Sequence, residues 1–446
     1  MVIDFLLERF QNKSSNTALI WNEEDYSYQW LYDKINEFSI FINANKISQN
    51  SIVALRSDFS PLSVAMMLAL IQHNCIFVPI SFAVKTVDEF LEIAETEFLI
   101  TIIDDKIELE KLNNKVNHKI LLNLKQEKHP GLILFSSGST GKSKAAVHDF
   151  VPLLDKFKVE RHTLRTITFL LFDHIGGVNT LLYILSNTGT IVAIKDRSPE
   201  NVCMLIEKYQ VELLPTSPSF IFMLLMSKAY EKYNIHSLKM VTYGTETMPE
   251  TTLKKMHELF PNIELKQTYG LSELGILRSK SRDNNSLWVK IGGEGFQTKV
   301  KEGILFIKAK SAMLGYLNAE SPFDDEGWFN TQDRVEVDGD WIKILGRVTE
   351  IINVGGQKVY PTEVESVLLE MENVKDVTVY SSPNPILGSV VSAKIVLENV
   401  EDLAALKKRI RLYCKDKLEQ FKIPVNVIID NNSQVSARFK KIRKFD

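Results

Sequence analysis

The segment from about residue 130 to residue 270 alternates short apolar runs with stretches long enough to be helices. Buried strands are predicted at the apolar, β-branched runs Gly131–Phe135, Thr166–Phe172, Thr190–Ile194, Val211–Pro215 and Lys239–Thr242. Helices are predicted between them, as at Asn201–Tyr209 and Glu250–Phe260. Because parallel strands need long crossover connections, this alternation indicates βαβ units. A helix at Ser63–Gln72 and a strand at Cys75–Pro79 start the pattern earlier. The sequence therefore predicts a large, layered α/β domain.

Past about residue 290 the pattern changes to short β-type runs separated by glycines. Turns are expected at these glycines: Gly292, Gly293, Gly295, Gly303 and Gly315. Tight turns between short strands are typical of antiparallel sheets, so a β-rich subdomain is predicted to follow the α/β part.

The last part of the chain has the pattern of a small α+β domain. We expect a helix from Pro361, strands at Val374–Tyr380 and Val390–Leu397, an amphipathic helix at Glu401–Gln420, and a strand at Val425–Ile429. About 100 residues are enough for such a domain. A boundary near Arg347 divides the chain into residues 1–346 and residues 347–446.

Composition and charge exclude several classes of protein. The 446 residues carry a net charge of −3, which argues against binding nucleic acid by bulk electrostatics. Cys75, Cys203 and Cys414 are far apart and form no Cys/His cluster, so neither a disulfide framework nor a zinc site is expected. The first residues lack a signal peptide's apolar core, and no stretch reaches the roughly 20 apolar residues of a spanning helix. We expect a cytoplasmic protein without a membrane span.

The strongest local motif is a loop rich in glycine, serine and threonine that follows the apolar strand at Gly131–Phe135. It contains Ser136, Ser137, Gly138, Ser139, Thr140, Gly141, Lys142, Ser143 and Lys144. Glycines let successive N–H groups point inward, hydroxyls add donors and lysines add charge, so the loop suits a polyphosphate. A Walker A loop is excluded because its first glycine would fall on Ser136. A flexible linker is the alternative, but linkers rarely follow a buried strand so closely.

This loop resembles the signature of the adenylate-forming superfamily, which includes acyl-CoA synthetases, firefly luciferase and the adenylation domains of peptide synthetases. Lys144 falls on the signature's lysine, whereas Ser143 and Ala145 replace its proline and its last glycine. The resemblance implies that the loop residues Ser136, Ser137, Gly138, Ser139, Thr140, Gly141 and Lys144 bind the phosphates of ATP. It also implies a large N-terminal α/β domain with a β-rich subdomain and a small, mobile α+β C-terminal domain.

Two further motifs follow in the family's order. Tyr269-Gly270-Leu271-Ser272-Glu273 resembles YGxTE, which implies that Tyr269 and Gly270 line the adenine site, that Ser272 touches the α-phosphate and that Glu273 holds Mg²⁺. A carboxylate suits that hard cation. The segment Gly327–Asp333 resembles GWxxTGD with Gln332 in place of glycine. Asp333 would then accept both ribose hydroxyls, and Arg347 of a GRxxDxI-like segment would also reach the ribose.

The C-terminal motifs imply a moving domain. Thr349 stands at the family's hinge position, usually Asp or Lys, and Gly356 lies in the turn expected beside the incoming thiol. Lys441 is assigned as the lysine that bridges the carboxylate and the α-phosphate, with Lys440 as an alternative register. Since one site cannot hold this lysine and admit a thiol at once, a large rotation of the C-terminal domain is expected.

The acyl pocket is predicted from three segments: the HxGG-like run that begins His174-Ile175, the residues Tyr243, Gly244 and Thr245, and Gly270. His174 would be an aromatic gate beside the thiol tunnel, and apolar Ile175 offers nothing to an α-ammonium group. A competing register makes Phe172 the gate and Asp173 the acid that binds an amino acid's ammonium group.

The activity implied is ATP- and Mg²⁺-dependent activation of a carboxylic acid, followed by transfer to the thiol of coenzyme A. Two alternatives stay open at this point. The chain could load an acyl or amino acid onto the phosphopantetheine arm of a carrier protein, or it could be a non-catalytic relative that binds a nucleotide.

Overall fold

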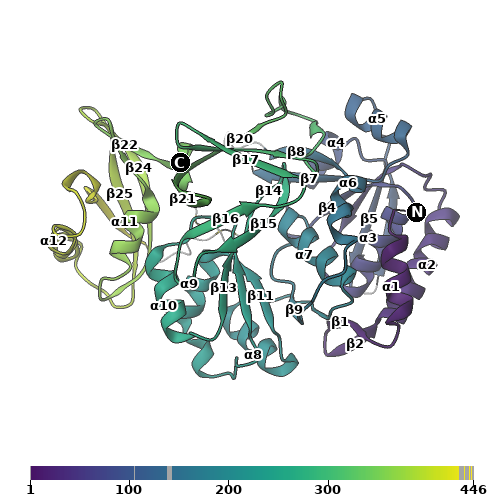
Figure 1. The fold of residues 1–446 in the computed structure, drawn as a ribbon, viewed down its shortest axis with the longest axis horizontal. Coiled ribbons are helices and arrows are strands. Elements are labelled where there is room, and N and C mark those ends of the chain that lie inside the picture. Colours follow the sequence, from purple (N-terminus) through teal and green to yellow (C-terminus); the bar gives the residue numbers. More distant parts are fainter. Residues whose placement is uncertain are drawn as a thin grey trace.

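The computed structural model describes residues 2–104, 106–137, 143–430, 436, 441 and 443. Two seven-stranded sheets form the large α/β part (Figure 1). The first sheet has the order β13 (Glu264–Gln267), β12 (Met240–Tyr243), β11 (Leu213–Thr216), β9 (Thr166–Ile167), β10 (Ile191–Val192), β1 (Thr17–Trp21) and β2 (Glu24–Ser27). The second has the order β19 (Gly315–Tyr316), β8 (Ser143–Asp149), β7 (Gly131–Ser137), β4 (Ile76–Ile80), β3 (Ile52–Arg56), β5 (Phe98–Ile103) and β6 (Lys106–Lys111).

Side chains along a strand point alternately to the two faces of its sheet, and helices pack on both faces of each sheet. Val53 and Leu55 of β3 belong to a core that also holds Leu19 of β1 and Ile191 of β10, so this core lies between the sheets. It is filled by the helices α1 (Asp4–Asn12), α2 (Tyr28–Ala44), α3 (Pro61–Gln72) and α7 (Ile175–Ser186). The outer faces carry α4 (Val87–Ile93) and α5 (Lys119–Glu127) on one side, and α8 (Pro199–Tyr209), α9 (Pro218–Ser227) and α10 (Glu250–Leu259) on the other. The result is a five-layer α/β arrangement.

Short local signals start several of these helices. Ser60 and Ser63 form a capping box at α3, and Ser198 and Ser217 cap α8 and α9 in front of a proline at the first helical position. Serine caps satisfy the free N–H groups of the first turn, and proline has no N–H to satisfy there.

A third sheet and a separate C-terminal domain complete the chain. The third sheet has the order β14 (Tyr269–Leu271), β15 (Gly275–Ser281), β16 (Trp288–Gly292), β21 (Trp341–Arg347), β20 (Phe329–Asp338), β18 (Ile304–Ala309) and β17 (Phe296–Lys301). The C-terminal domain contains β22 (Ile352–Val354), β23 (Gln357–Val359), α11 (Pro361–Leu368), β24 (Val374–Asn384), β25 (Gly388–Leu397), α12 (Leu403–Cys414) and β26 (Asn426–Ile429) around its own core. It forms the end of the molecule opposite α1 and α2 (Figure 1).

The predicted fold class is confirmed, and two of its predicted elements are shorter than expected. β7 pairs in parallel with β4, as the βαβ pattern predicts, and also forms an antiparallel hairpin with β8. The strand expected at Thr166–Phe172 is β9, Thr166–Ile167, because the chain then leaves the sheet to reach α7. The helix expected at Glu401–Gln420 is α12, Leu403–Cys414. The boundary near Arg347 stays a prediction. In the described residues no helix is long and apolar enough to cross a membrane.

Candidate active site

Asp333, Tyr269 and Arg347 meet on the third sheet although they are far apart in the sequence. Arg347 is the direct cross-strand partner of Asp333 in the β20–β21 pair. Its Nε lies 3.5 Å from Asp333 Oδ1, while the Tyr269 hydroxyl donates a hydrogen bond of 2.5 Å to Asp333 Oδ2. The proposed ribose acceptor and adenine-lining residue are therefore in direct contact.

Burial controls the charge of this cluster. Asp333 is only 6% exposed, and burial raises the pKa of its carboxyl group although Arg347 and Tyr269 act to lower it. Burial and the neighbouring Asp333 also raise the pKa of Tyr269 well above its usual value, so its phenol stays protonated and donates.

Gln332, at the position where the related motif has glycine, has a backbone conformation that glycine adopts easily. Its φ is 60°, in the left-handed region that side chains other than Asn and Asp rarely adopt. Its N–H donates to Asn330 Oδ1 at 3.0 Å, and the next N–H, that of Asp333, donates to Thr331 Oγ1 at 3.0 Å. These two hydrogen bonds hold the local turn that presents Asp333.

Glu273 lies beside a tyrosine that the motifs did not predict. The hydroxyl of Tyr316, in β19, donates a hydrogen bond of 2.5 Å to Glu273 Oε1, and burial together with Glu273 raises the pKa of Tyr316. Lys144 Nζ lies 5.2 Å from the centre of the Tyr316 ring. Within the described residues Glu273 Oε2 has no hydrogen-bond donor, so this acceptor-only oxygen fits a divalent cation such as Mg²⁺.

Two further residues that sequence reasoning missed attach these motifs to the phosphate-loop hairpin. His148 of β8 is buried, which lowers its pKa, and its Nε2 lies 2.6 Å from the Ser272 carbonyl oxygen. Asn318 accepts from the Ala145 N–H at 3.0 Å and donates to the Ser143 carbonyl at 2.8 Å. No sequence pattern marks either residue, because each contact spans more than 120 positions of the chain.

The hairpin that carries the loop pairs Ser136 with Lys144 and Ser137 with Ser143. The predicted phosphate ligands Gly138, Ser139, Thr140 and Gly141, and Lys142 beside them, lie outside the described residues, as does Lys440. Their roles stay predictions.

The HxGG-like run forms the start of α7. His174 is the N-cap residue, and its Nδ1 accepts from the Gly176 N–H at 3.0 Å. Ile175 is 2% exposed and packs in the core between the two sheets. A Cβ on Gly177 would lie 2.0 Å from the Leu171 carbonyl oxygen, so this glycine permits close packing of the chain. Contact of His174 or Ile175 with an acyl group stays a prediction.

The competing register has little support in the geometry. Phe172 is 1% exposed and packs edge-on against Phe59 and Phe77, which is a core position rather than a gate. Asp173 is also buried, and its Oδ2 accepts from Ser81 Oγ at 2.8 Å. Both side chains are thus part of the protein's internal packing and hydrogen bonding.

The glycines of the predicted acyl pocket are closely packed. A Cβ on Gly244 would lie 2.6 Å from Thr268 Oγ1, and a Cβ on Gly270 would lie 2.3 Å from a methyl group of Ile276. These distances describe only the direction that a Cβ would take, so the assignment of the two glycines to the acyl pocket stays a prediction. Tyr243 is 1% exposed, and its hydroxyl has no hydrogen-bond partner among the described residues. Thr245, which is exposed, has a φ of 74° in the turn after β12.

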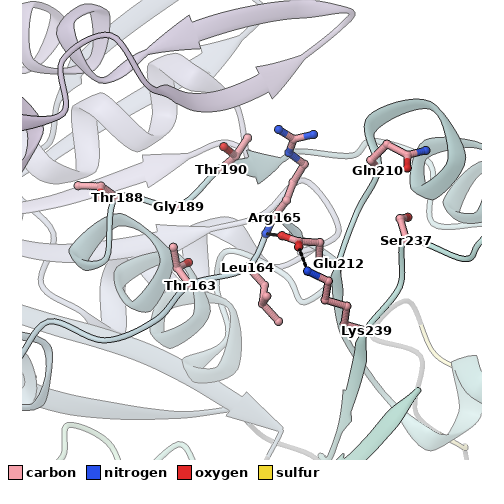
Figure 2. A pocket seen from close by; sticks show the side chains of 10 residues that line it. All are labelled: Thr163, Leu164, Arg165, Thr188, Gly189, Thr190, Gln210, Glu212, Ser237 and Lys239. Atoms are coloured by element: carbon pink, nitrogen blue, oxygen red, sulfur yellow. Dashed lines mark hydrogen bonds and ion pairs between the residues drawn. The ribbon is translucent and has the colours of Figure 1, made fainter. Parts of the chain in front are cut away.

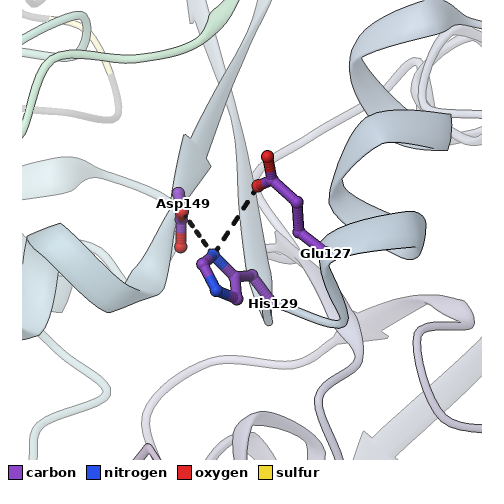
Figure 3. Close-up of side chains that lie close together, drawn as sticks. All are labelled: Glu127, His129 and Asp149. Atoms are coloured by element: carbon purple, nitrogen blue, oxygen red, sulfur yellow. Dashed lines mark hydrogen bonds and ion pairs between the residues drawn. The ribbon is translucent and has the colours of Figure 1, made fainter.

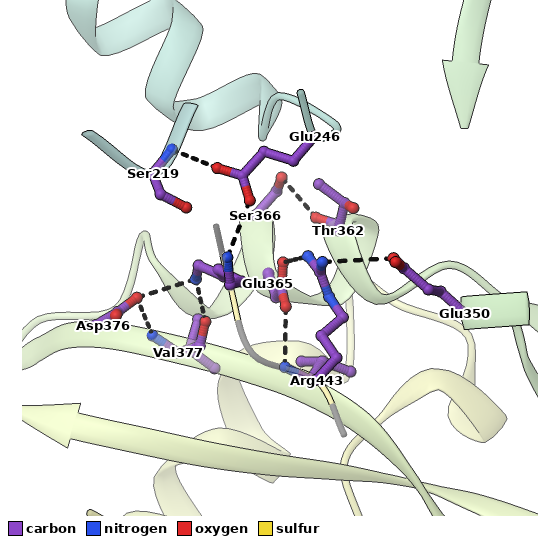
Figure 4. A network of polar contacts seen from close by, with 11 residues as sticks. Ser219, Glu246, Glu350, Thr362, Glu365, Ser366, Asp376, Val377 and Arg443 are labelled. Carbon is purple, nitrogen blue, oxygen red and sulfur yellow. Dashed lines mark hydrogen bonds and ion pairs between the residues drawn. The ribbon is translucent and has the colours of Figure 1, made fainter. Parts of the chain in front are cut away.

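The C-terminal motif residues lie apart from this cluster in the present domain orientation. Lys441 contacts Asp376 and Val377 of β24, and those contacts form part of a polar network with Arg443 (Figure 4). Gly356 has a φ of 90° in the β22–β23 turn, and a Cβ there would meet nothing within 4 Å. Thr349 lies in the short 3-10 helix Val348–Glu350 after Arg347.

A hollow lies at the edge of the first sheet where its parallel strands begin. Arg165, Thr190, Glu212 and Lys239 each precede a parallel strand and line a hollow of about 540 Å³ (Figure 2). Glu212 accepts from the Arg165 N–H at 2.9 Å and from Lys239 Nζ at 2.5 Å. This amino edge is remote from Tyr243 and Gln267, which end their strands at the carboxyl edge.

His129 joins two carboxylates at the base of the β7–β8 hairpin (Figure 3). Its Nδ1 is 2.8 Å from Asp149 Oδ2 and 3.8 Å from Glu127 Oε2. Asp149 Oδ1 accepts from the Val151 N–H at 2.8 Å and so caps α6 (Phe150–Leu154). These contacts connect the two ends of the hairpin.

Comparison with known proteins agrees with this geometry. Residues 6–317 match the family of AMP-binding enzymes, and residues 363–435 match the AMP-binding enzyme C-terminal domain. Acyl-CoA synthetase 7 of Caenorhabditis elegans is 30% identical over 56% of this chain and 49% of its own length. 2-Succinylbenzoate–CoA ligase of Listeria monocytogenes is 24% identical over 96% of this chain and 95% of its own length.

Solved structures share the whole fold. The anthranilate CoA ligase AuaEII with anthranoyl-AMP has a TM-score of 0.81 at 17% identity, covering 99% of this chain and 95% of its own. The o-succinylbenzoate CoA synthetase of Bacillus subtilis with its acyl-adenylate intermediate has a TM-score of 0.76 at 20% identity, covering 99% and 97%. The resemblance found in the sequence motifs is confirmed, and the chain belongs to the family of AMP-binding enzymes, the adenylate-forming ligases.

Proposed function

We propose that this protein is an AMP-forming acid–CoA ligase. A carboxylate oxygen of the acid attacks the α-phosphorus of ATP, pyrophosphate leaves, and the acyl-adenylate then reacts with the thiol of coenzyme A to give the thioester and AMP. The observation that carries the proposal is the Asp333–Tyr269–Arg347 cluster together with the adjoining Glu273, Tyr316 and Lys144. The motifs had predicted all three members of the first group as nucleotide ligands, and Lys144 and Glu273 of the second as ligands of the phosphates and of Mg²⁺.

Each group has a task in the first half-reaction. Asp333 accepts hydrogen bonds from the ribose hydroxyls, with its carboxylate held by the Tyr269 hydroxyl and by Arg347. Mg²⁺, when bound, neutralises negative charge on the phosphates. Glu273 would hold it, and Tyr316 fixes the orientation of that carboxylate. Lys144 adds positive charge beside them. Such a step depends on positioning and charge neutralisation more than on proton transfer.

Lys441 is proposed to bridge the carboxylate and the α-phosphate while charge spreads over the bridging oxygens. Because Lys441 contacts Asp376 and Val377 of its own domain in the present orientation, its side chain has to leave these partners before adenylation, in addition to the domain rotation that the motifs imply. Gly356, in an exposed turn of the same domain, is proposed to face the thiol in the second half-reaction.

Aromatic acids are the first substrates to test. Several relatives are named as ligases of aromatic acids, among them indoleacetate–CoA ligase of Aromatoleum aromaticum and 4-coumarate–CoA ligase 1 of Narcissus pseudonarcissus. The names of these relatives also favour coenzyme A over a carrier protein as the acceptor. α-Amino acids are not expected to react, because Ile175, next to His174, is apolar and buried and offers nothing to an ammonium group.

Exchange of labelled pyrophosphate into ATP tests the proposal. Aryl, fatty and α-amino acids are supplied one at a time with Mg²⁺, and coenzyme A is then added to the acids that react. We expect exchange with at least one aryl or fatty acid and formation of its CoA thioester. ATP binding without exchange for any acid would favour the non-catalytic alternative, and thioester formation only on a carrier protein would favour that acceptor.

A further inference from the structure

Lys441 contacts residues of both domains. Its ammonium group lies 3.0 Å from Asp376 Oδ1 and also donates to the Val377 carbonyl oxygen. The ring of Phe222, from α9 of the large domain, lies 5.7 Å from Nζ. Only 6% of the lysine side chain is exposed, so the ion pair is largely removed from water.

The backbone beside Lys441 is bound to the large domain. The Lys441 N–H donates to Glu246 Oε2 at 3.1 Å, and the other oxygen of Glu246 accepts from the Ser219 N–H at 2.8 Å. Glu246 therefore joins the start of α9 to the C-terminal segment.

Arg443 binds the same segment to the C-terminal domain. It lies 2.9 Å from Glu365 of α11 and 3.5 Å from Glu350. The Glu365 side chain is fully buried. Although burial opposes its ionisation, Arg443 and Lys441 hold the pKa of Glu365 below its usual value. The segment with Lys441 and Arg443 thus has partners on both sides of the domain interface.

The strand that carries Asp376 is shaped for this contact. Val374 pairs with Leu397 and Asp376 with Val396, so the pairing of β24 with β25 shifts by one residue between them. A bulge of this kind redirects the side chains that follow it. Asp376 Oδ1 also accepts from the Val377 N–H at 2.7 Å, which fixes the carboxylate under the lysine.

We propose that Asp376 is a positioning residue that holds Lys441 in a docked state, and that this state competes with adenylation. The inference rests on the proposed function, because Lys441 matters to the first half-reaction only if it bridges the carboxylate and the α-phosphate. The same ammonium group cannot be bonded to Asp376 and to the nucleotide at once. Each adenylation therefore has to break the Lys441–Asp376 pair, and the strength of that pair sets the fraction of molecules ready to react.

Asp376→Asn tests this directly. The amide keeps an oxygen for the Val377 N–H but loses the charge that attracts Lys441, so the fold is retained and the docked state is weakened. Removing one charge–charge contact is expected to raise kcat/KM for ATP in pyrophosphate exchange by roughly three- to tenfold. The matched control is Asp430→Asn, which removes a pair of 3.2 Å with Lys394 in the same domain, at 20% side-chain exposure against 16% for Asp376.

A second readout does not depend on catalysis. An amine-reactive acylating reagent followed by peptide mass spectrometry measures how accessible each lysine is. Lys441 should be labelled slowly in the unaltered protein and several times faster in Asp376→Asn, whereas Asp430→Asn should leave its labelling unchanged. Faster exchange and faster labelling in Asp376→Asn alone support the proposal.

Three results separate the possible failures. Unchanged exchange and unchanged labelling of Lys441 in Asp376→Asn would overturn the docked state. Faster labelling with unchanged or slower exchange would show a docked lysine that does not limit adenylation, which also overturns the proposal. If the unaltered protein shows no exchange with any acid, the proposed function fails, and the labelling result alone then decides whether Asp376 holds Lys441.

Discussion

Replacing Asp333 by asparagine isolates the charge of the proposed ribose acceptor. Asparagine keeps the shape of the side chain and an oxygen that can accept from Tyr269, whose hydroxyl is 2.5 Å away. It loses the negative charge and gains an NH₂ group that cannot accept a hydrogen bond. The fold should therefore survive, and the loss should appear in nucleotide binding.

The size of the effect follows from the environment of Asp333. The residue is 6% exposed, so its hydrogen bonds to ribose would form with little competition from water. Hydrogen bonds to a charged group contribute about 1.5–3 kcal/mol each, and one of the two is retained in weakened form by asparagine. A total loss of about 2–4 kcal/mol is expected, which weakens ATP binding by roughly 30- to 1000-fold.

The same residue predicts a pH dependence with a definite sign. Burial raises the pKa of Asp333, and only its carboxylate form accepts both ribose hydroxyls. ATP affinity should therefore fall on acidification, beginning at a pH above the ordinary value of 3.8 for a free aspartate. The pH dependence of folding stability has the opposite sign. A raised pKa means that the carboxylate form of Asp333 is disfavoured in the folded state, so the contribution of this group to stability declines as the pH rises through that pKa.

Isothermal titration with ATP from pH 5 to pH 8 measures both effects. Asp340→Asn is the matched control, because Asp340 lies in the same β20–β21 hairpin but is 76% exposed and pairs with Lys290 at 2.6 Å. Equal ATP affinity in Asp333→Asn and in the unaltered protein, with the same pH profile, would refute the ribose assignment.

Three further predictions test other contacts. Tyr316→Phe removes the hydroxyl 2.5 Å from Glu273 Oε1, so the Mg²⁺ concentration for half-maximal exchange should rise several-fold, and an unchanged requirement would argue against Glu273 as the metal ligand. Gly177→Ala places a Cβ 2.0 Å from the Leu171 carbonyl oxygen, so the free energy of unfolding should drop by about 1–3 kcal/mol in a denaturant titration, and wild-type stability would contradict the packing argument. Activity with α-amino acids that is lost in Asp173→Ala but kept in His174→Ala would show that the competing register of the pocket is correct.

The sequence predicted the helices and strands that depend on local residue patterns. Periodic apolar runs located β7, β12, α8 and α10 to within a few residues. The motifs also named Asp333 and Tyr269, which the fold brings into contact. Tyr316, His148 and Asn318 could not be found in this way, because their roles come from pairings between distant strands. The close packing around Gly244 and Gly270 has the same origin, since the atoms of Thr268 and Ile276 that a Cβ would meet are known only once the chain is folded.

The position of Lys441 was also beyond the sequence. Its motif assigned a catalytic role, but the partner that it has in this orientation, Asp376, lies 65 residues earlier and carries no motif. The contacts that a mobile domain makes between catalytic steps depend on how its surface fits its neighbours in three dimensions. A sequence motif that reflects only the chemical step does not contain this information.

Oxygen transfer from the acid to the nucleotide tests the central claim most directly. A carboxylic acid labelled with ¹⁸O in both carboxyl oxygens is incubated with the protein, ATP, Mg²⁺ and coenzyme A. The masses of the products are then measured by mass spectrometry. If the carboxylate attacks the α-phosphorus, one ¹⁸O ends in AMP and the other stays in the thioester, while pyrophosphate is unlabelled. Label in pyrophosphate or inorganic phosphate, or AMP without label, would contradict activation through an acyl-adenylate.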